Sequence, residues 1–158
     1  MSGIRMRLIV LVLITVCALQ IAAWQGNQPA VNSSGPALGK WNFTAKDSEG
    51  VVWTGTLTVS KVDPNRFDAG KYHSLCNIEA VSTKGGLGVE HPSKYDPSTR
   101  TFSFGEEGNW GGSTYTAVLS ANDKKLDKGK WRQSDRDFDS KKLVVVASGD
   151  WSAELIGK

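Results

Sequence analysis

The sequence predicts an all-β fold: an antiparallel up-and-down barrel of about eight strands, with a β-sandwich as the alternative. Apolar and polar residues alternate with a period of two along several short segments after Gly39. Polar turn formers, such as those of Asp47–Gly50, separate these segments. No stretch of about ten or more residues shows the 3.6-residue apolar spacing of an amphipathic helix. A regular series of short strands joined by local turns is typical of barrels and sandwiches.

The alternation is clearest in Val52–Val59. Trp53, Leu57 and Val59 share one face of this segment, and three threonines share the other, as in a half-buried strand. By contrast, Leu143–Ala147 is a continuous apolar run, which predicts a more buried strand. The same alternation as in the first segment recurs in four others: Gly70–Ala80, Thr99–Phe104, Ser113–Ser120 and Trp151–Leu155.

Residues 1–23 have the composition of a signal peptide. Two arginines precede the apolar stretch Leu8–Leu19, and two alanines after it offer small residues for cleavage. The stretch is shorter than the roughly 20 apolar residues of a membrane span. The alternatives are an uncleaved anchor and lipid attachment at Cys17. We expect three regions: a signal peptide at 1–23, a flexible linker at 24–38 and a β-barrel domain at 39–158.

Removal of residues 1–23 changes the charge and the cysteine content. The full sequence has 19 basic and 16 acidic residues, and without Arg5 and Arg7 the balance is 17 against 16, or +1. A nearly neutral domain lacks the many cations that contact phosphates, so we expect no nucleic-acid partner. Cys76 remains alone, which excludes an internal disulfide and predicts a small buried hydrophobe. An intermolecular disulfide and a metal-binding thiol are the alternatives for this residue.

Five units of glycine, any residue and an aromatic residue occur along the chain. Each is consistent with the start of a strand, where glycine permits close backbone approach and the aromatic side chain turns inward. The aromatic residues either pack a core or line a ligand cavity, and the pattern leaves both open. The five units are Gly39–Trp41, Gly70–Tyr72, Gly108–Trp110, Gly129–Trp131 and Gly149–Trp151.

The first unit, Gly39-Lys40-Trp41, resembles the G-x-W signature of lipocalins, in which the tryptophan closes one end of a barrel. Over about residues 39–158 the pattern is also similar to avidin-like barrels, with G-x-Y on an early strand, tryptophans on later strands and W-x-A on the last. The resemblance implies a barrel that binds a small, largely apolar molecule. In avidins an asparagine stands two residues after the first tryptophan, followed by a ligand-binding serine, whereas here Asn42 directly follows Trp41 and Phe43 takes the next position. The lipocalin T-D-Y motif is absent.

No catalytic or metal-binding motif emerges from the residues. The sequence lacks G-x-S-x-G, H-E-x-x-H, C-x-x-C and the phosphate-binding loop. His73 and Cys76 would point to opposite faces of a strand. Asp135, Asp137 and Asp139 lack the glycine and glutamate that complete a calcium loop, so we interpret them as a solvated charged hairpin. We therefore expect no enzymatic activity, no cofactor and no metal ion.

These observations predict a secreted or periplasmic, non-enzymatic barrel that binds a small apolar or amphipathic ligand, without stable membrane insertion after signal cleavage. Such pockets are mostly apolar with few polar anchors. The alternative is a solidly packed barrel that acts through its surface as an interaction, adhesion or inhibitor module. The residues expected to bind the ligand are Tyr72, Phe102, Phe104, Trp110 and Trp131 as walls and Trp41 as the floor.

Overall fold

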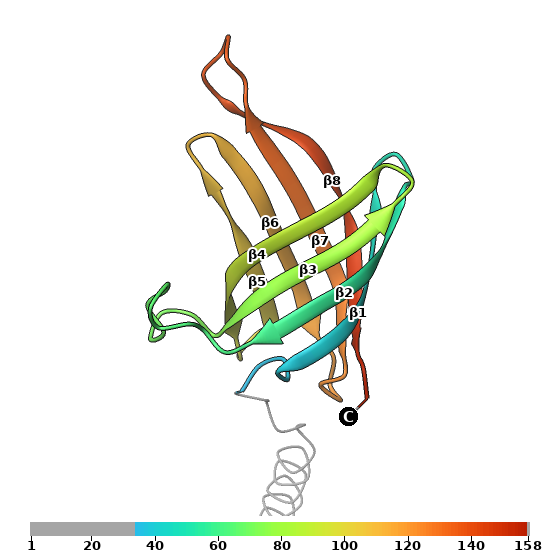
Figure 1. Ribbon diagram of the computed structural model, residues 1–158, viewed down its shortest axis with the longest axis vertical. Helices are drawn as coiled ribbons and strands as arrows, with labels where there is room; N and C mark the ends of the chain where they lie inside the picture. Colours follow the sequence, from blue (N-terminus) through green and yellow to red (C-terminus); the bar gives the residue numbers. More distant parts are fainter. Residues whose placement is uncertain (1–33, 158) are drawn as a thin grey trace, which may run out of the picture. The chain divides into compact units, whose positions relative to one another are not determined.

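The computed structural model describes residues 34–157, which form a closed barrel of eight antiparallel strands in chain order (Figure 1). The predicted all-β, up-and-down barrel is thereby confirmed. Within this part of the chain, no helix is long and apolar enough to span a membrane. The predicted signal peptide and linker residues 24–33 lie outside the described residues. The strands are β1 (Gly39–Asp47), β2 (Val52–Ser60), β3 (Ser74–Ser82), β4 (Gly85–Asp96), β5 (Thr101–Gly108), β6 (Gly111–Leu119), β7 (Lys125–Arg136) and β8 (Leu143–Leu155).

The predicted turn at Asp47–Gly50 joins β1 to β2 through local chemistry. The Asp47 carboxylate accepts hydrogen bonds from the backbone N–H groups of Glu49 (2.9 Å) and Val51 (2.8 Å). Gly50 has a φ of +87°, a left-handed conformation that glycine adopts without steric cost. The turn therefore reverses the chain with its own polar groups satisfied.

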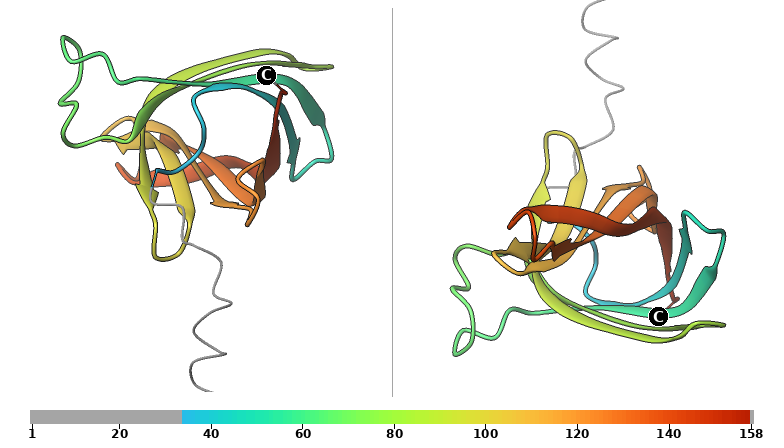
Figure 2. Two further views of the ribbon diagram at one scale, coloured as in Figure 1. Left: turned by 90° about the horizontal axis from the view of Figure 1, so that it is seen from below. Right: turned by 90° about the horizontal axis from the view of Figure 1, so that it is seen from above.

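The barrel has two unlike ends. The connections β2–β3, β4–β5 and β6–β7 lie at one end, below in Figure 1, here called the closed end. The connections β1–β2, β3–β4, β5–β6 and β7–β8 lie at the opposite end, here called the hairpin end. Strands β4 and β5 pair only from Ser93↔Phe104 to Asp96↔Thr101, all near the closed end. Strands β1 and β8 pair from Trp41↔Leu155 only as far as Asp47↔Gly149. Beyond its pairs with β4, strand β5 separates from β4, as seen from above in Figure 2. Strand β1 ends where its pairs with β8 end.

Residues 34–38 pack across the closed end. Gly35 and Pro36 are buried, and the Trp41 indole Nε1 donates a hydrogen bond to the Ala37 carbonyl at 3.1 Å. These five residues are the last of the predicted linker.

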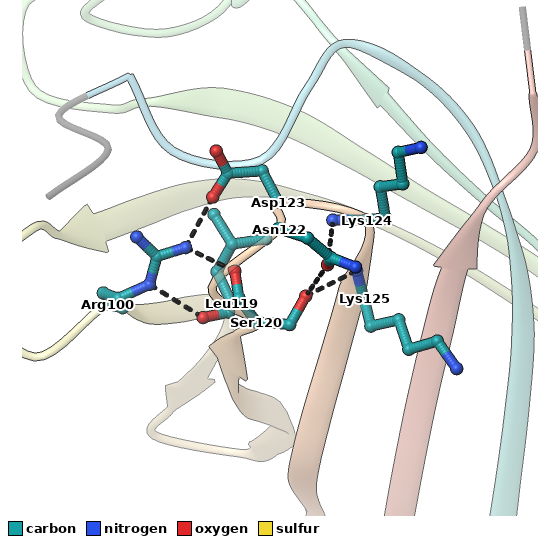
Figure 3. Close-up of polar contacts among 7 residues, drawn as sticks. All are labelled: Arg100, Leu119, Ser120, Asn122, Asp123, Lys124 and Lys125. Carbon is teal, nitrogen blue, oxygen red and sulfur yellow. Dashed lines mark hydrogen bonds and ion pairs between the residues drawn. The ribbon is translucent and has the colours of Figure 1, made fainter. Parts of the chain in front are cut away.

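Arg100 joins two connections at the closed end (Figure 3). Its Nε donates a hydrogen bond to the Leu119 carbonyl at 2.9 Å, and its Nη2 contacts the Ser120 carbonyl and the Asp123 carboxylate. The backbone N–H of Leu119 in turn donates to the Arg100 carbonyl at 2.9 Å. One guanidinium thus ties the β4–β5 connection to the β6–β7 turn.

Aromatic rings fill the middle of the barrel. Phe104 and Tyr115 stack with ring centroids 4.7 Å apart, and Trp151 stands edge-on to both at 5.7 and 6.3 Å. Phe43 lies 5.8 Å from Trp151. All four side chains are at most 3% exposed, so the rings pack against one another. Every second side chain of a strand points to the same face, so these rings point into the barrel. Phe43, for example, has an exposed residue on each side of it along β1.

Two of the five predicted glycine units make close contacts inside the sheet. A Cβ at Gly129 would lie 2.2 Å from the Trp151 carbonyl oxygen, and a Cβ at Gly149 would lie 2.0 Å from the Lys46 carbonyl oxygen. Both glycines lie within strands, and among the five only Gly39 begins one. The interpretation as a strand start therefore applies to one unit of the five. Glycine serves here for close approach of backbone and ring.

Tyr72 does not belong to a strand, although the alternation in Gly70–Ala80 predicted one there. Strand β3 begins at Ser74, after a connection that contains polar turns. Hydrogen bonds from Gly70 and Lys71 to Asp68 form one of these turns, which interrupts the extended backbone before Tyr72.

The expectation that Leu143–Ala147 forms a more buried strand is wrong. Leu143, Val144, Val145 and Val146 are 42%, 41%, 57% and 55% exposed. They lie in the part of the β7–β8 hairpin that projects beyond the other hairpin turns (Figure 1). Because β1 ends before reaching them, no strand covers the outer edge of this segment.

Candidate functional site

Three of the six predicted ligand-binding residues lie in the packed interior. Trp41, Phe102 and Phe104 are 0%, 0% and 3% exposed. The Phe102 and Phe104 rings are 5.8 Å apart, and Phe102 meets the His73 ring edge-on at 6.2 Å. Side chains with so little accessible surface are packed against their neighbours. In this state the three rings form core rather than the wall of an open cavity.

The other three predicted residues lie outside this interior cluster. Trp110 is 70% exposed at the β5–β6 turn, where the Arg136 guanidinium lies 5.1 Å from its ring. Trp131 is partly buried on β7, and its indole N–H is buried without a hydrogen-bond partner among residues 34–157. Tyr72 lies in the connection before β3. Of these three, Trp131 packs against the core, whereas Tyr72 and Trp110 lie in connections between strands.

Tyr72 lies at a groove on the outside of the barrel, here called the outer groove. Phe104 and Trp131 also belong to its lining, but their strand neighbours face outward and their own rings face the interior. The volume of the outer groove is about 610 Å³. One row of paired residues crosses four neighbouring strands and forms its wall. The row is Lys94 on β4, Ser103 on β5, Thr116 on β6 and Lys130 on β7. These positions alternate with buried ones, so their side chains face outward. A second row, Gly105↔Thr114↔Arg132, runs beside the first. The lining also includes Lys71 and Pro92.

Gly105 shapes the middle of the outer groove. Its φ is +92°, and a Cβ at this position would lie 2.0 Å from the Ser113 carbonyl oxygen. Only glycine fits this bend of β5, which coincides with the loss of pairing to β4 after Phe104. The groove thus opens where the two strands separate, with the exposed side chains of the neighbouring rows around it.

The charge of the outer groove is mostly positive. Four basic side chains and one acidic side chain, Glu106, line it. Lys130 pairs with Asp150, and Arg132 pairs with Glu107 at 2.8 Å, both on the neighbouring surface. Lys71 and Lys94 form no ion pair within the described part of the chain. Two lysines are therefore available to contact an anion.

Sequence reasoning did not single out these basic residues. Each is an ordinary polar residue on the exposed face of a strand, and lysine at such a position is common on protein surfaces. Only the pairing of β4 to β7 brings Lys94, Ser103, Thr116 and Lys130 into one row. Alternation alone predicted that they face outward but not that they are neighbours.

Cys76 is buried on β3, as predicted for a small hydrophobe. Burial raises the pKa of its thiol to about 12, against smaller opposing effects of hydrogen bonds with Ser93 and Ser74. The hydroxyls of Ser74 and Ser93 lie 2.6 Å apart beside it. Nowhere in residues 34–157 do three or more His, Cys, Asp or Glu side chains gather as metal ligands would. The Cys76 thiol therefore stays protonated, next to the hydrogen-bonded hydroxyls of Ser74 and Ser93.

The aspartates of the D-x-D-x-D run lie at the β7–β8 hairpin. The Asp137 carboxylate accepts hydrogen bonds from the backbone N–H groups of Asp139 (2.8 Å) and Ser140 (3.1 Å), which lowers its pKa. Asp135 bonds the backbone N–H of Arg136 at 2.7 Å. Asp135 and Asp137 therefore stabilise a charged turn, in agreement with the predicted charged hairpin.

Comparison with protein families and curated proteins found no relative of this chain, since no protein-family model and no curated protein matches it. The closed antiparallel barrel of eight strands is compatible with a calycin-like fold.

Proposed function

We propose that the protein is an exported, non-enzymatic barrel that binds a small amphipathic anion in the outer groove. The observation that carries this proposal is the contrast between a filled interior and the outer groove, in which unpaired lysines and hydroxyls surround about 610 Å³ of space. Export is inferred from the signal-like residues 1–23.

The chemistry of the lining supports an amphipathic anion. Lys71 and Lys94 offer charge-assisted hydrogen bonds to a carboxylate, sulfate or phosphate. Ser103, Thr114 and Thr116 add hydroxyl groups that donate and accept. The Tyr72 ring and Pro92 give an apolar surface at the border, which suits a short hydrocarbon or aromatic tail.

Binding is favoured over catalysis because the lining residues include no His, Cys or Asp. The groove hydroxyls therefore have no neighbouring imidazole that would activate them as nucleophiles. Glu106 is a single acid, without the second carboxylate of an acid–base pair. The cations and hydroxyls are groups that hold a ligand rather than transform it.

The test is isothermal titration of the complete chain with octyl phosphate and with octyl glucoside, both below their micelle concentrations. Octyl phosphate is expected to bind about tenfold more tightly than the neutral glucoside, because only the phosphate pairs with lysine. Lys94→Gln is expected to weaken octyl phosphate binding about threefold or more, and added salt weakens it further.

Lys40→Gln is the matched control, since Lys40 is an exposed lysine on β1 outside the outer groove. This variant is expected to bind octyl phosphate as the wild type does. Equal affinity for both octyl compounds, or an equal loss in Lys40→Gln and Lys94→Gln, would contradict the proposal.

A packed barrel that acts through its surface as a protein-interaction module is the second candidate. The exposed apolar segment Leu143–Val146 favours it. The two functions use different surfaces and are compatible with each other.

A further inference from the structure

The first residues of β8 form a strand with one unpaired edge, here called the β8 edge (Leu143–Ala147). Strand β7 pairs with it on one side, from Arg136↔Leu143 to Gln133↔Ala147. On the other side, β1 reaches only Gly149, and the Ser48 N–H donates to the Ser148 carbonyl at 2.9 Å. Within residues 34–157 no strand pairs with the β8 edge from that side. Backbone donors and acceptors along it are therefore open to another strand.

The β8 edge lacks the features that usually protect an exposed strand. Natural edges carry lysine, proline or inward charges that oppose pairing with another chain. Here the run L-V-V-V-A-S-G from Leu143 to Gly149 contains neither charge nor proline. Val144 and Val145 are 41% and 57% exposed and point to opposite faces, so both faces of the segment are apolar. Three adjacent valines also have high strand propensity. The only protective feature is the register shift opposite Gln133 and Ser134.

We propose that the β8 edge pairs antiparallel with the β8 edge of a second copy of the chain, forming a two-fold symmetric dimer. A two-fold contact requires a self-complementary surface. An uncharged apolar strand meets this requirement, because each copy offers the other the same backbone groups and the same valine side chains.

The charges that flank the β8 edge agree with an antiparallel arrangement. Lys141 and Lys142 precede it, and Asp150 follows it. Antiparallel pairing places the lysine end of each strand toward the aspartate end of the other. Asp150 also pairs with Lys130 of its own chain, so this attraction orients the strands more than it stabilises them.

A lipid surface fits the segment less well than a strand does. The projecting hairpin carries three aspartates, Asp135, Asp137 and Asp139, against three basic residues between Arg136 and Lys142. It therefore offers no net positive charge to anionic headgroups. Lipid tails also leave the backbone groups of the β8 edge without hydrogen-bond partners.

The test is sedimentation velocity of the complete chain over a concentration series. The wild type is expected to show a concentration-dependent monomer–dimer equilibrium. Val145→Lys is expected to weaken dimer formation about tenfold or more, because it places a charge against the apolar partner strand. Val145→Thr keeps the β-branched shape and is expected to weaken it less, which guards against a folding defect in the lysine variant.

Val81→Lys is the matched control. Val81 is 64% exposed on β3, but its strand is paired on both sides, with Thr54 and with Gly86. This variant is expected to dimerise as the wild type does, and the near-ultraviolet circular dichroism of all variants checks their fold. A wild type that stays monomeric to about millimolar concentration overturns the proposal. Dimers that persist unchanged in Val145→Lys, or that are lost equally in Val81→Lys, overturn it as well. Octyl phosphate titration does not involve the β8 edge, so the two proposals fail independently.

Discussion

Two apolar strand segments in this barrel have opposite environments. On β1, Trp41, Phe43 and Ala45 alternate with exposed residues and are 0%, 1% and 4% exposed. At the start of β8, four consecutive apolar residues, Leu143–Val146, are 41% to 57% exposed. Alternation of apolar and polar residues predicts that one face of a strand packs against a core. A continuous apolar run indicates only that both faces of the strand are apolar, and it does not predict that either face is buried. Whether such a run is covered depends on the length of its neighbours, here on where β1 ends.

The sharpest test of this difference removes one side chain from the core that β1 packs against and one from the exposed run of β8. Trp151→Ala is expected to lower the free energy of unfolding by about 3–5 kcal/mol. The variant loses ring contacts with Phe43, Phe104 and Tyr115 and the hydrogen bond from Nε1 to the Lys130 carbonyl. Val145→Ala in the exposed run is expected to change the free energy of unfolding by about 0.5 kcal/mol or less.

Chemical denaturation followed by circular dichroism measures both values, at a protein concentration low enough to keep the chain monomeric. Comparable losses in Trp151→Ala and Val145→Ala would show that the core and the exposed run do not differ in burial as described.

The close approach of strands around the core is tested by adding a methyl group. Gly149→Ala is expected to destabilise the fold by about 1–3 kcal/mol. Its Cβ would lie 2.0 Å from the Lys46 carbonyl oxygen and 2.7 Å from the Trp131 Nε1. Gly88→Ala on β4, where nothing lies within 4 Å, is the control and is expected to be neutral or slightly stabilising in the same denaturation assay. A Gly149→Ala variant as stable as Gly88→Ala would exclude this packing.

The closed end is tested at Arg100. Arg100→Lys is expected to cost about 1–2 kcal/mol of unfolding free energy, because a lysine cannot contact the Leu119 and Ser120 carbonyls and Asp123 at once (Figure 3). The control is Arg66→Lys, whose ion pair with Glu90 is exposed and is expected to contribute little. If both variants lower the midpoint temperature of thermal unfolding equally, the Arg100 contacts do not stabilise the closed end.

His73 predicts a smaller, pH-dependent effect at the closed end. Burial lowers the pKa of His73 below its ordinary value of 6.5, and a hydrogen bond to the Pro36 carbonyl opposes the shift. As pH falls below 6.5, the unfolded chain therefore binds a proton that the folded chain resists, and stability decreases. The His73 contribution is complete above pH 6.5. His73→Gln is expected to show a shallower loss of unfolding free energy between about pH 7 and 5, and an unchanged slope would contradict this.

Much of the fold follows from local sequence, because strand alternation and turn chemistry are local properties. Val52–Val59 and the turn at Asp47–Gly50 lie where their residues predict them. Tyr72 was misplaced because one Asp68-centred turn interrupts an otherwise strand-like segment. The burial of Leu143–Ala147 was mispredicted because it depends on the length of β1, a distant element.

The candidate site was less predictable than the fold. The aromatic residues chosen from the sequence fell into two groups, core rings such as Phe102 and groove borders such as Tyr72, and a single strand pattern does not separate these. The outer groove itself depends on pairing across four strands. Lys94 and Lys130 are 36 positions apart in the sequence and share one row only in the barrel.

Whether the ligand binds outside a filled barrel is tested by following backbone amide and tryptophan indole resonances together. Thr116 and Lys130 line the outer groove, whereas Trp41 and Trp151 lie in the core at 0% and 3% exposure. In a nitrogen–proton correlation spectrum titrated with octyl phosphate, we expect the backbone amide resonances of Thr116 and Lys130 to shift and the indole resonances of Trp41 and Trp151 to remain in place. Shifts of the Trp41 and Trp151 indoles with Thr116 and Lys130 unchanged would place the ligand inside the barrel and contradict the proposal.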